Sequence, residues 1–199
     1  MINKTVRFAL IIGAMFVVSC GGGAAGGGSA KMDIKVGGKD TSLSVKSGGG
    51  YRSTKTFTAI DGKITTASSF YTVMANYEMD TASLATMKKP LTSAEQSRVT
   101  IQLIGEEGTE QNNDLKPGIY KADPSQKYMK VDSISVVTFA DGKETNTNFD
   151  TNFSSSKITG QVEVTSVTAD AISGKIDVTE GDKSIKGTFT AKMPAKNKN

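Results

Sequence analysis

The chain has 199 residues, with 24 lysines and arginines, 20 acidic residues, one cysteine and no histidine. Without histidine, His-based catalytic triads, most zinc sites and the usual general base near neutral pH are excluded. The single cysteine excludes an internal disulfide. The basic residues form no stripe with interleaved aromatic residues, so nucleic acid is not an expected partner.

The first 19 residues have the composition of a signal peptide. Lys4 and Arg7 form a short basic start, and residues 8–18 are an uncharged apolar run of 11 residues. Such a run is too short to span a bilayer and has the length of a signal-peptide core. We therefore expect residues 1–19 to be a signal peptide that takes no part in the fold.

A candidate lipidation motif ends this segment. Val17, Val18 and Ser19 precede Cys20, and this order resembles the lipobox of bacterial lipoproteins, although leucine is commoner in place of Val17. The resemblance covers the first 20 residues. It implies cleavage between Ser19 and Cys20 and a diacylglycerol on the Cys20 thiol. The alternative is an ordinary secretory signal followed by an accidental cysteine.

The residues after Cys20 indicate where the protein is held. Gly21 stands where aspartate would imply retention at the inner membrane, so the lipoprotein resemblance implies the outer membrane. Residues 21–30 read GGGAAGGGSA, a composition typical of flexible tethers. We therefore expect a lipidated cysteine and a Gly/Ala tether at 20–30, a single all-β domain at 31–193 and a frayed basic tail at 194–199. The membrane is the expected partner, reached through the lipid in the cell envelope.

The body alternates apolar and polar residues with the period of two that is typical of half-buried strands. Asp61-Gly62 and Asp141-Gly142 are type I′ hairpin signals, and we interpret residues 48–50, three glycines, as a break in the chain. Roughly ten strands with frequent turns predict an all-β antiparallel sandwich, with a closed β-barrel as the alternative. Thr92 and Glu95 have the spacing of a capping box, which predicts a short helix at 92–97.

Residues 158–193 contain three similar alternating runs, which predict a three-strand antiparallel meander at the end of the domain. Gly181-Asp182 suits a type II′ turn, and counting back from this turn pairs Glu180 with Lys183 and Gly174 with Phe189. A phenyl ring over a cross-strand glycine fills a weak strand position; the alternative is that the glycines mark bulges. A three-residue loop at 168–170 would place Glu163 opposite Lys175.

Four motifs in residues 99–193 occur in a recognisable order. They are the alternating run at 99–103, the turn Lys116-Pro117-Gly118-Ile119-Tyr120, a G-x-V-x-V strand at 160–164 and the closing I-x-G-T-F run at 185–189. This order resembles a broad group of small, uncharacterised bacterial lipoproteins with an antiparallel β-sandwich. The resemblance implies that fold and offers no catalytic residues.

The sequence predicts no catalytic residue, no metal site and no cofactor, and therefore no enzyme. The loop at 106–114 is rich in oxygen ligands of the kind that calcium prefers, but its spacing differs from an EF-hand, and we interpret it as a solvated loop. We expect a lipid-anchored envelope β-domain with a binding or structural role and an unidentified protein or envelope partner. The alternative is a small-ligand carrier, with a barrel cavity lined by Tyr71, Tyr77 and Phe189.

Overall fold

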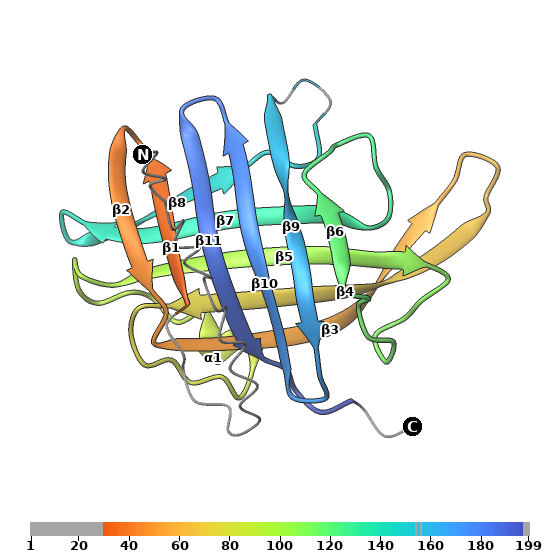
Figure 1. Cartoon of the computed structure of the whole chain (residues 1–199), viewed down its shortest axis with the longest axis horizontal. Coiled ribbons are helices and arrows are strands. Elements are labelled where there is room, and N and C mark those ends of the chain that lie inside the picture. Colours follow the sequence, from red (N-terminus) through yellow and green to blue (C-terminus); the bar gives the residue numbers. More distant parts are fainter. Residues whose placement is uncertain (1–29, 154, 156, 197–199) are drawn as a thin grey trace, which may run out of the picture.

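The computed structural model describes residues 30–153, 155 and 157–196 (Figure 1). Ser19 and Cys20, the predicted cleavage and lipidation residues, lie outside these ranges. Within the described residues the chain forms eleven strands and one short helix. In chain order these are β1 (Lys31–Val36), β2 (Lys39–Ser44), β3 (Ser47–Thr58), β4 (Ile64–Ala75), α1 (Leu84–Met87), β5 (Ser97–Glu107), β6 (Gly118–Lys121), β7 (Lys130–Ala140), β8 (Lys143–Phe149), β9 (Ile158–Val167), β10 (Ala171–Glu180) and β11 (Lys183–Lys192).

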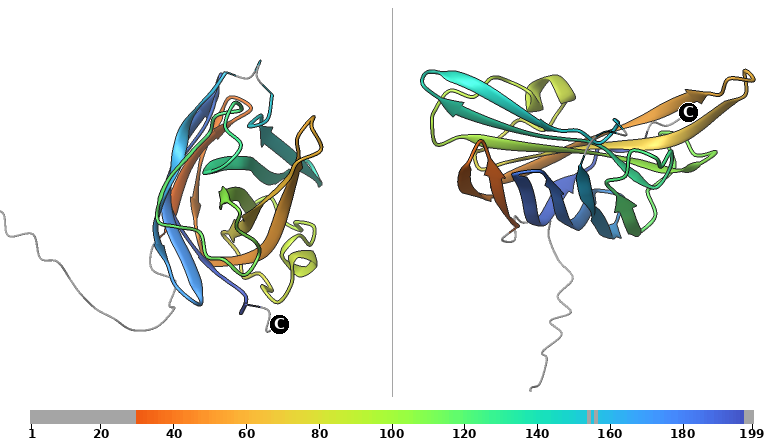
Figure 2. Two further views of the ribbon diagram at one scale, coloured as in Figure 1. Left: turned by 90° about the vertical axis from the view of Figure 1, so that its right-hand side faces the viewer. Right: turned by 90° about the horizontal axis from the view of Figure 1, so that it is seen from above.

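The strands form two layers that face each other (Figures 1 and 2). One layer has the order β2-β1-β11-β10-β9-β6, the other has the order β8-β7-β5-β4-β3, and every pairing within a layer is antiparallel. The strands of one layer run across those of the other, as in crossed sheet packing. Two corners join the layers, each through one parallel residue pair, Lys192 with Gly49 and Lys121 with Lys130. The predicted all-β antiparallel sandwich is confirmed, with eleven strands among the described residues in place of about ten.

The core fills the space between the two layers. Strand alternation sends every second side chain inward, and the inward residues are mostly branched aliphatic and aromatic. The layer that contains β3, β4, β5 and β7 contributes Phe70, Met74, Ile101, Leu103, Ile134 and Val136. The layer that contains β1, β9, β10 and β11 contributes Met32, Ile34, Val162, Val164, Ile176, Val178, Ile185 and Phe189, and all of these residues are buried. The burial of this apolar surface is the main force that holds the two layers together.

The C-terminal meander, β9 to β11, has the predicted register. Glu180 faces Lys183 and Gly174 faces Phe189. The turn between β10 and β11 has positive φ at Gly181 and not at Asp182, as a type II′ turn requires. Because this short turn fixes the pairing of both strands, the register could be counted from the sequence alone.

The joint between β9 and β10 is less regular than the sequence predicted. Residues 168–170 separate the strands, and Glu163 faces Lys175 as expected. However, Val167 faces Ile172, and the register shifts by one residue between Ser173 and Gly174. The expected pair forms because this bulge restores the register that a three-residue loop would have set.

The two predicted type I′ hairpins differ in the structure. Asp141 and Gly142 both have positive φ, which confirms a type I′ turn between β7 and β8. Between β3 and β4 only Gly62 has positive φ, and its N–H donates to the carbonyl of Ala59. The β3–β4 loop is therefore a longer connection, and its prediction as a two-residue type I′ turn was wrong.

The three glycines at 48–50 do not break the chain, because they lie inside β3. An added Cβ at Gly49 would come within 2.6 Å of the Met87 sulfur, and one at Gly48 would meet the carbonyl of Thr190. The strand therefore needs glycine where it passes α1 on one side and the end of β11 on the other. What the sequence indicated as a break is a close approach at a corner of the sandwich.

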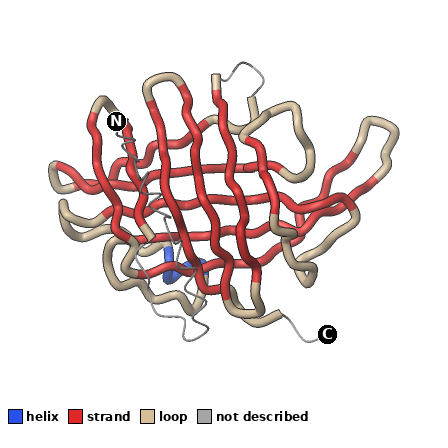
Figure 3. The backbone as a smooth tube through the Cα atoms, in the orientation of Figure 1, coloured by secondary structure: helices blue, strands red, loops and turns tan. Residues whose placement is uncertain are grey.

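The predicted helix at 92–97 was also wrong. The backbone N–H and the hydroxyl of Thr92 both donate to Gln96 Oε1, and the chain enters β5 at Ser97, so there is no room for a helix. The capping box forms instead at Ser83 and Thr86, at the start of α1. Figure 3 shows how small this helix is beside the strands. Among the described residues, no helix is long and apolar enough to cross a membrane.

Candidate functional site

Arg52 is a charged residue on the inner face of β3. Strand alternation turns it inward, where it pairs across the sheet with Phe70, and only 6% of the residue is exposed. Its guanidinium carbon lies 4.5 Å from the centre of the Phe70 ring, a cation–π contact. Burying a charge among apolar side chains is unfavourable unless hydrogen bonds compensate. The partners of Arg52 therefore decide what the site can do.

One nitrogen of this guanidinium is paired. Nη1 of Arg52 donates to Oδ1 of Asp114 at 2.8 Å, and Oδ2 of the same carboxylate accepts from Nζ of Lys196 at 2.8 Å. Partial burial raises the pKa of Asp114, but hydrogen bonds from Lys196 and Arg52 outweigh it and hold that pKa below its ordinary value of 3.8. Two cations thus share one carboxylate, and these three side chains carry a net positive charge.

The other edge of the guanidinium is unpaired. Nε and Nη2 of Arg52 are buried and have no hydrogen-bond partner among the residues that the structure describes. These two nitrogens form one edge of a planar group and present parallel N–H donors, the fork that matches a carboxylate or phosphate. Leaving a buried donor unpaired costs about 1–3 kcal/mol. A group with two acceptor oxygens could pair both donors at once and remove this cost.

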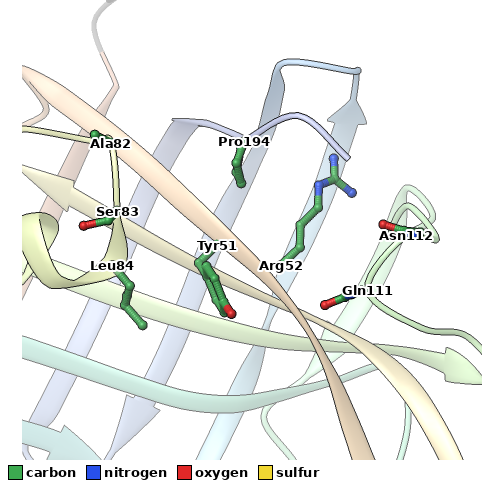
Figure 4. A pocket seen from close by; sticks show the side chains of 8 residues that line it. All are labelled: Tyr51, Arg52, Ala82, Ser83, Leu84, Gln111, Asn112 and Pro194. Carbon is green, nitrogen blue, oxygen red and sulfur yellow. The ribbon is translucent and has the colours of Figure 1, made fainter. Parts of the chain in front are cut away.

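A pocket of about 230 Å³ lies at Arg52 (Figure 4). Three separate segments and β3 build its walls. It is lined by Tyr51 and Arg52 of β3, Ala82, Ser83 and Leu84 at the start of α1, Gln111 and Asn112 of the loop after β5, and Pro194 beyond β11. Figure 4 shows the Arg52 side chain between Pro194 and the loop that carries Asn112. Of the described lining residues, one is a cation, and the others are polar or apolar.

The loop and the C-terminal segment that cover Arg52 are held by a few contacts. The Gln111 N–H donates to Thr54 Oγ1 at 2.9 Å, and the side chain of Met193 packs where Gly50 has no Cβ. Lys196, from the segment that the sequence treats as a frayed tail, pairs with Asp114. Both side chains of that outer ion pair are more than 40% exposed, so water and salt weaken it.

A second buried charge cluster lies on β7, and its donors are partnered. Lys130 is 5% exposed, and its Nζ donates to the Thr151 carbonyl at 3.3 Å and to Asn152 Oδ1 at 3.0 Å. Desolvation lowers the pKa of Lys130. Asp132 beside it accepts from Lys55 at 2.6 Å. Because these groups satisfy one another, the cluster fits a structural role.

The residues that the sequence named as candidates do not meet at the Arg52 pocket. Phe189 is buried in the core, Tyr71 lies under Lys88 Nζ at 4.5 Å, and neither of them nor Tyr77 lines the pocket. In the loop at 106–114, Glu106 pairs with Lys116, and Asp114 with Arg52 and Lys196. Across the described part of the chain, no group of three or more acidic or cysteine residues is placed to hold a metal ion.

Sequence reasoning did not single out Arg52, although a signal existed. Only three of the 24 basic residues are arginine, at positions 7, 52 and 98, and the rest are lysine. In such a chain an arginine inside a strand marks a position where a planar fork is needed, because lysine supplies only a point charge. The hydrogen-bond partner of Arg52 could not be predicted, since Asp114 lies 62 residues away along the chain.

Comparison with protein-family models, with curated proteins and with solved structures found no match for this chain.

Proposed function

We propose that this protein is a lipid-anchored binding protein of the bacterial cell envelope and that the Arg52 pocket is its binding site. The observation that carries the proposal is the unpaired Nε and Nη2 edge of a buried arginine beside a pocket. An anionic group of a partner would satisfy both donors at once. Binding would therefore remove a cost that the free protein carries.

The chemistry of the pocket supports binding over catalysis. The pocket side chains comprise one arginine, a tyrosine, a serine, two amides and apolar residues. Ser83 is engaged with Thr86 in the helix cap. A nucleophile needs a base within hydrogen-bond reach, and the described lining residues do not pair these two roles. The proposal therefore includes no catalytic residue, no cofactor and no metal.

The anchoring part of the proposal is supported by the sequence. Val17-Val18-Ser19-Cys20 follows an uncharged apolar run, and a Gly/Ala segment separates Cys20 from β1. A lipid on Cys20 would hold the domain at the membrane, and Gly21 favours the outer membrane by the lipoprotein resemblance. The tether would let the pocket face partners at a distance from the surface. The carrier alternative has less support, because aliphatic and aromatic side chains fill the space between the layers.

Two measurements on the full chain test this proposal. Wild type and Cys20→Ala are expressed in a bacterial host with labelled palmitate, and label in the membrane fraction is expected for the wild type alone. Equal label in both chains would contradict the anchor. Solubilised envelope is then incubated with wild type, Arg52→Lys and the control Arg98→Lys. We expect capture of a partner to fall by about tenfold or more in Arg52→Lys only, since a tenfold loss is about 1.4 kcal/mol. Equal capture by all three proteins would show that Arg52 does not contribute to partner binding.

A further inference from the structure

We propose that the Arg52 pocket binds a carboxylate, which accepts hydrogen bonds from Nε and Nη2 of Arg52 with its two oxygens. This inference rests on the proposed function, because it names the ligand class of the same site. Asp114 keeps Nη1, so the incoming carboxylate uses only the donors that are unpaired in the described residues. The ligand replaces no existing hydrogen bond of the guanidinium.

Geometry and charge favour a carboxylate over a phosphate. Two parallel N–H groups match the two oxygens of one planar carboxylate, whereas a phosphate has three oxygens to satisfy and carries close to two charges at neutral pH. Among the residues that the structure describes, Arg52 is the one cationic residue that lines the pocket. Together with Asp114 and Lys196 it forms a cluster of net charge +1, which a single negative charge neutralises. A dianion would leave excess negative charge beside Asp114.

The pocket limits the size of the acid. A volume of about 230 Å³ lies below the range typical of drug-sized ligands, about 300–1,000 Å³. Tyr51, Leu84 and Pro194 offer apolar surface for a small body, while the amides of Gln111 and Asn112 can bond a neighbouring polar group. Both a small free carboxylic acid and the last residue of a peptide have this chemistry. The carboxylate is common to both sources.

The ligand reaches Arg52 when its cover opens. The unpaired nitrogens are buried, and the outer contact over them is the ion pair between Asp114 and Lys196. Such exposed pairs contribute little to stability, so a small displacement of residues 194–196 is inexpensive.

The test observes the Arg52 donors directly. The full chain carries three arginines, so its arginine Nε–H NMR spectrum in detergent holds few signals, and Arg52→Lys identifies the one of interest. Isobutyrate serves as the free acid and N-acetyl-alanine as the mimic of a peptide terminus. Isobutyramide and N-acetyl-alanine amide lack the charge, and methylphosphonate supplies a phosphate-like group. Arg98, whose guanidinium donates to the carbonyls of Met87 and Lys89, is the internal reference.

We expect at least one acid to shift the Arg52 signal with saturation at about 10 mM or less, as for a dissociation constant near 1 mM. The amides should not shift it, and the Arg98 signal should stay in place. Ala82→Trp, which fills the pocket and keeps Arg52, should weaken binding by about tenfold or more. This variant also tests the site if Arg52→Lys fails to fold. A response to isobutyrate alone indicates a free acid, and a response to N-acetyl-alanine alone indicates a peptide terminus.

Three results would overturn the inference: no shift with either acid, an equal shift with the amides, or a larger shift with methylphosphonate. The same measurements distinguish a failure of the carboxylate inference from a failure of the proposed function. If an envelope partner is captured through Arg52 while neither acid binds, the carboxylate inference is wrong and the binding function stands. If an acid shifts the Arg52 signal but no envelope component is captured, the ligand class stands and the envelope partner does not.

Discussion

The ring of Phe189 lies across Gly174 on the neighbouring strand of the closing meander. Two of its carbons lie 2.7 Å and 2.8 Å from the point that a Cβ on Gly174 would occupy, and the carbonyl of Glu163 meets the same point. The glycine therefore makes room for the ring, and the ring fills the surface that the glycine leaves open. The sequence predicted this pairing from the turn at Gly181 and Asp182.

Gly174→Ala should destabilise the domain. The added methyl group would force the Phe189 ring and the backbone of β9 to move, and such overpacking costs about 1–3 kcal/mol. Ser173→Ala, at the adjacent position whose side chain is only partly buried, is the control and should change stability by less than about 0.5 kcal/mol. Urea midpoints of both variants measure the difference. A neutral Gly174→Ala would show that the ring is free to move.

Phe189→Ala should cost about 3–5 kcal/mol, the range for removing a buried phenyl group from a core. Phe189 is 1% exposed, whereas Thr188 beside it points to the outer face. Thr188→Ala should therefore cost well under half of that amount, because successive residues of a strand face opposite sides. Urea midpoints that are equally low for both variants would mean that the faces are assigned wrongly.

Tyr120→Phe tests the turn that opens β6. Tyr120 is fully buried, and its hydroxyl donates to the carbonyl of Lys116 at 2.8 Å, which ties the strand to the turn before it. Burial raises the pKa of Tyr120. Removing the hydroxyl leaves that carbonyl without this donor, so we expect a loss of about 1–2 kcal/mol. Tyr51→Phe, at a tyrosine that is 44% exposed, is the control and should be nearly neutral. Thermal unfolding of the two variants measures the difference, and equal melting temperatures would count against this role.

Calcium should not stabilise the loop at 106–114. Glu106 is paired with Lys116, and Asp114 with Arg52 and Lys196, so these carboxylates already have cationic partners. A bound ion would raise the melting temperature by mass action. We expect a shift below about 2 °C at about 5 mM calcium, measured against a chelator control. A larger shift that the chelator reverses would establish a metal site.

The parts of the fold that sequence predicted well are those governed by local rules. Strand alternation and a two-residue turn determine pairing over short distances, so the register from Gly174 to Phe189 could be counted. The glycines at 48–50 were misread because their role depends on Met87 and Thr190, which no local pattern connects to them. The helix at 92–97 was wrongly predicted because Thr92 donates to the side chain of Gln96, so the predicted capping box does not form, and because β5 already begins at Ser97.

The candidate site could not be predicted from local sequence patterns. Arg52, Asp114 and Lys196 come from β3, the loop after β5 and the C-terminal segment, which are far apart in the sequence and meet only in the folded sandwich. Whether Arg52 points inward or outward can be assigned only once the register of β3 is known. Whether its donors are paired depends on contacts across the whole sandwich, which is why the unpaired edge emerged from the structure.

The dependence of stability on acid pH should report the pairing of Asp114. Its pKa is held below 3.8 in the folded protein, so the ionised carboxylate stabilises the fold above the unfolded value, and this contribution is lost as pH falls through the folded value. Asp114→Asn should therefore lower the urea midpoint at pH 7, where it leaves the buried guanidinium of Arg52 without its anion. The difference from the wild type should shrink as the pH is lowered toward about 3, since the protonated carboxyl resembles the amide. Asp40→Asn, at an exposed position of β2, controls for the loss of one negative charge. A difference between wild type and Asp114→Asn that stays constant from pH 7 to about 3 would mean that Asp114 does not stabilise Arg52 through its charge.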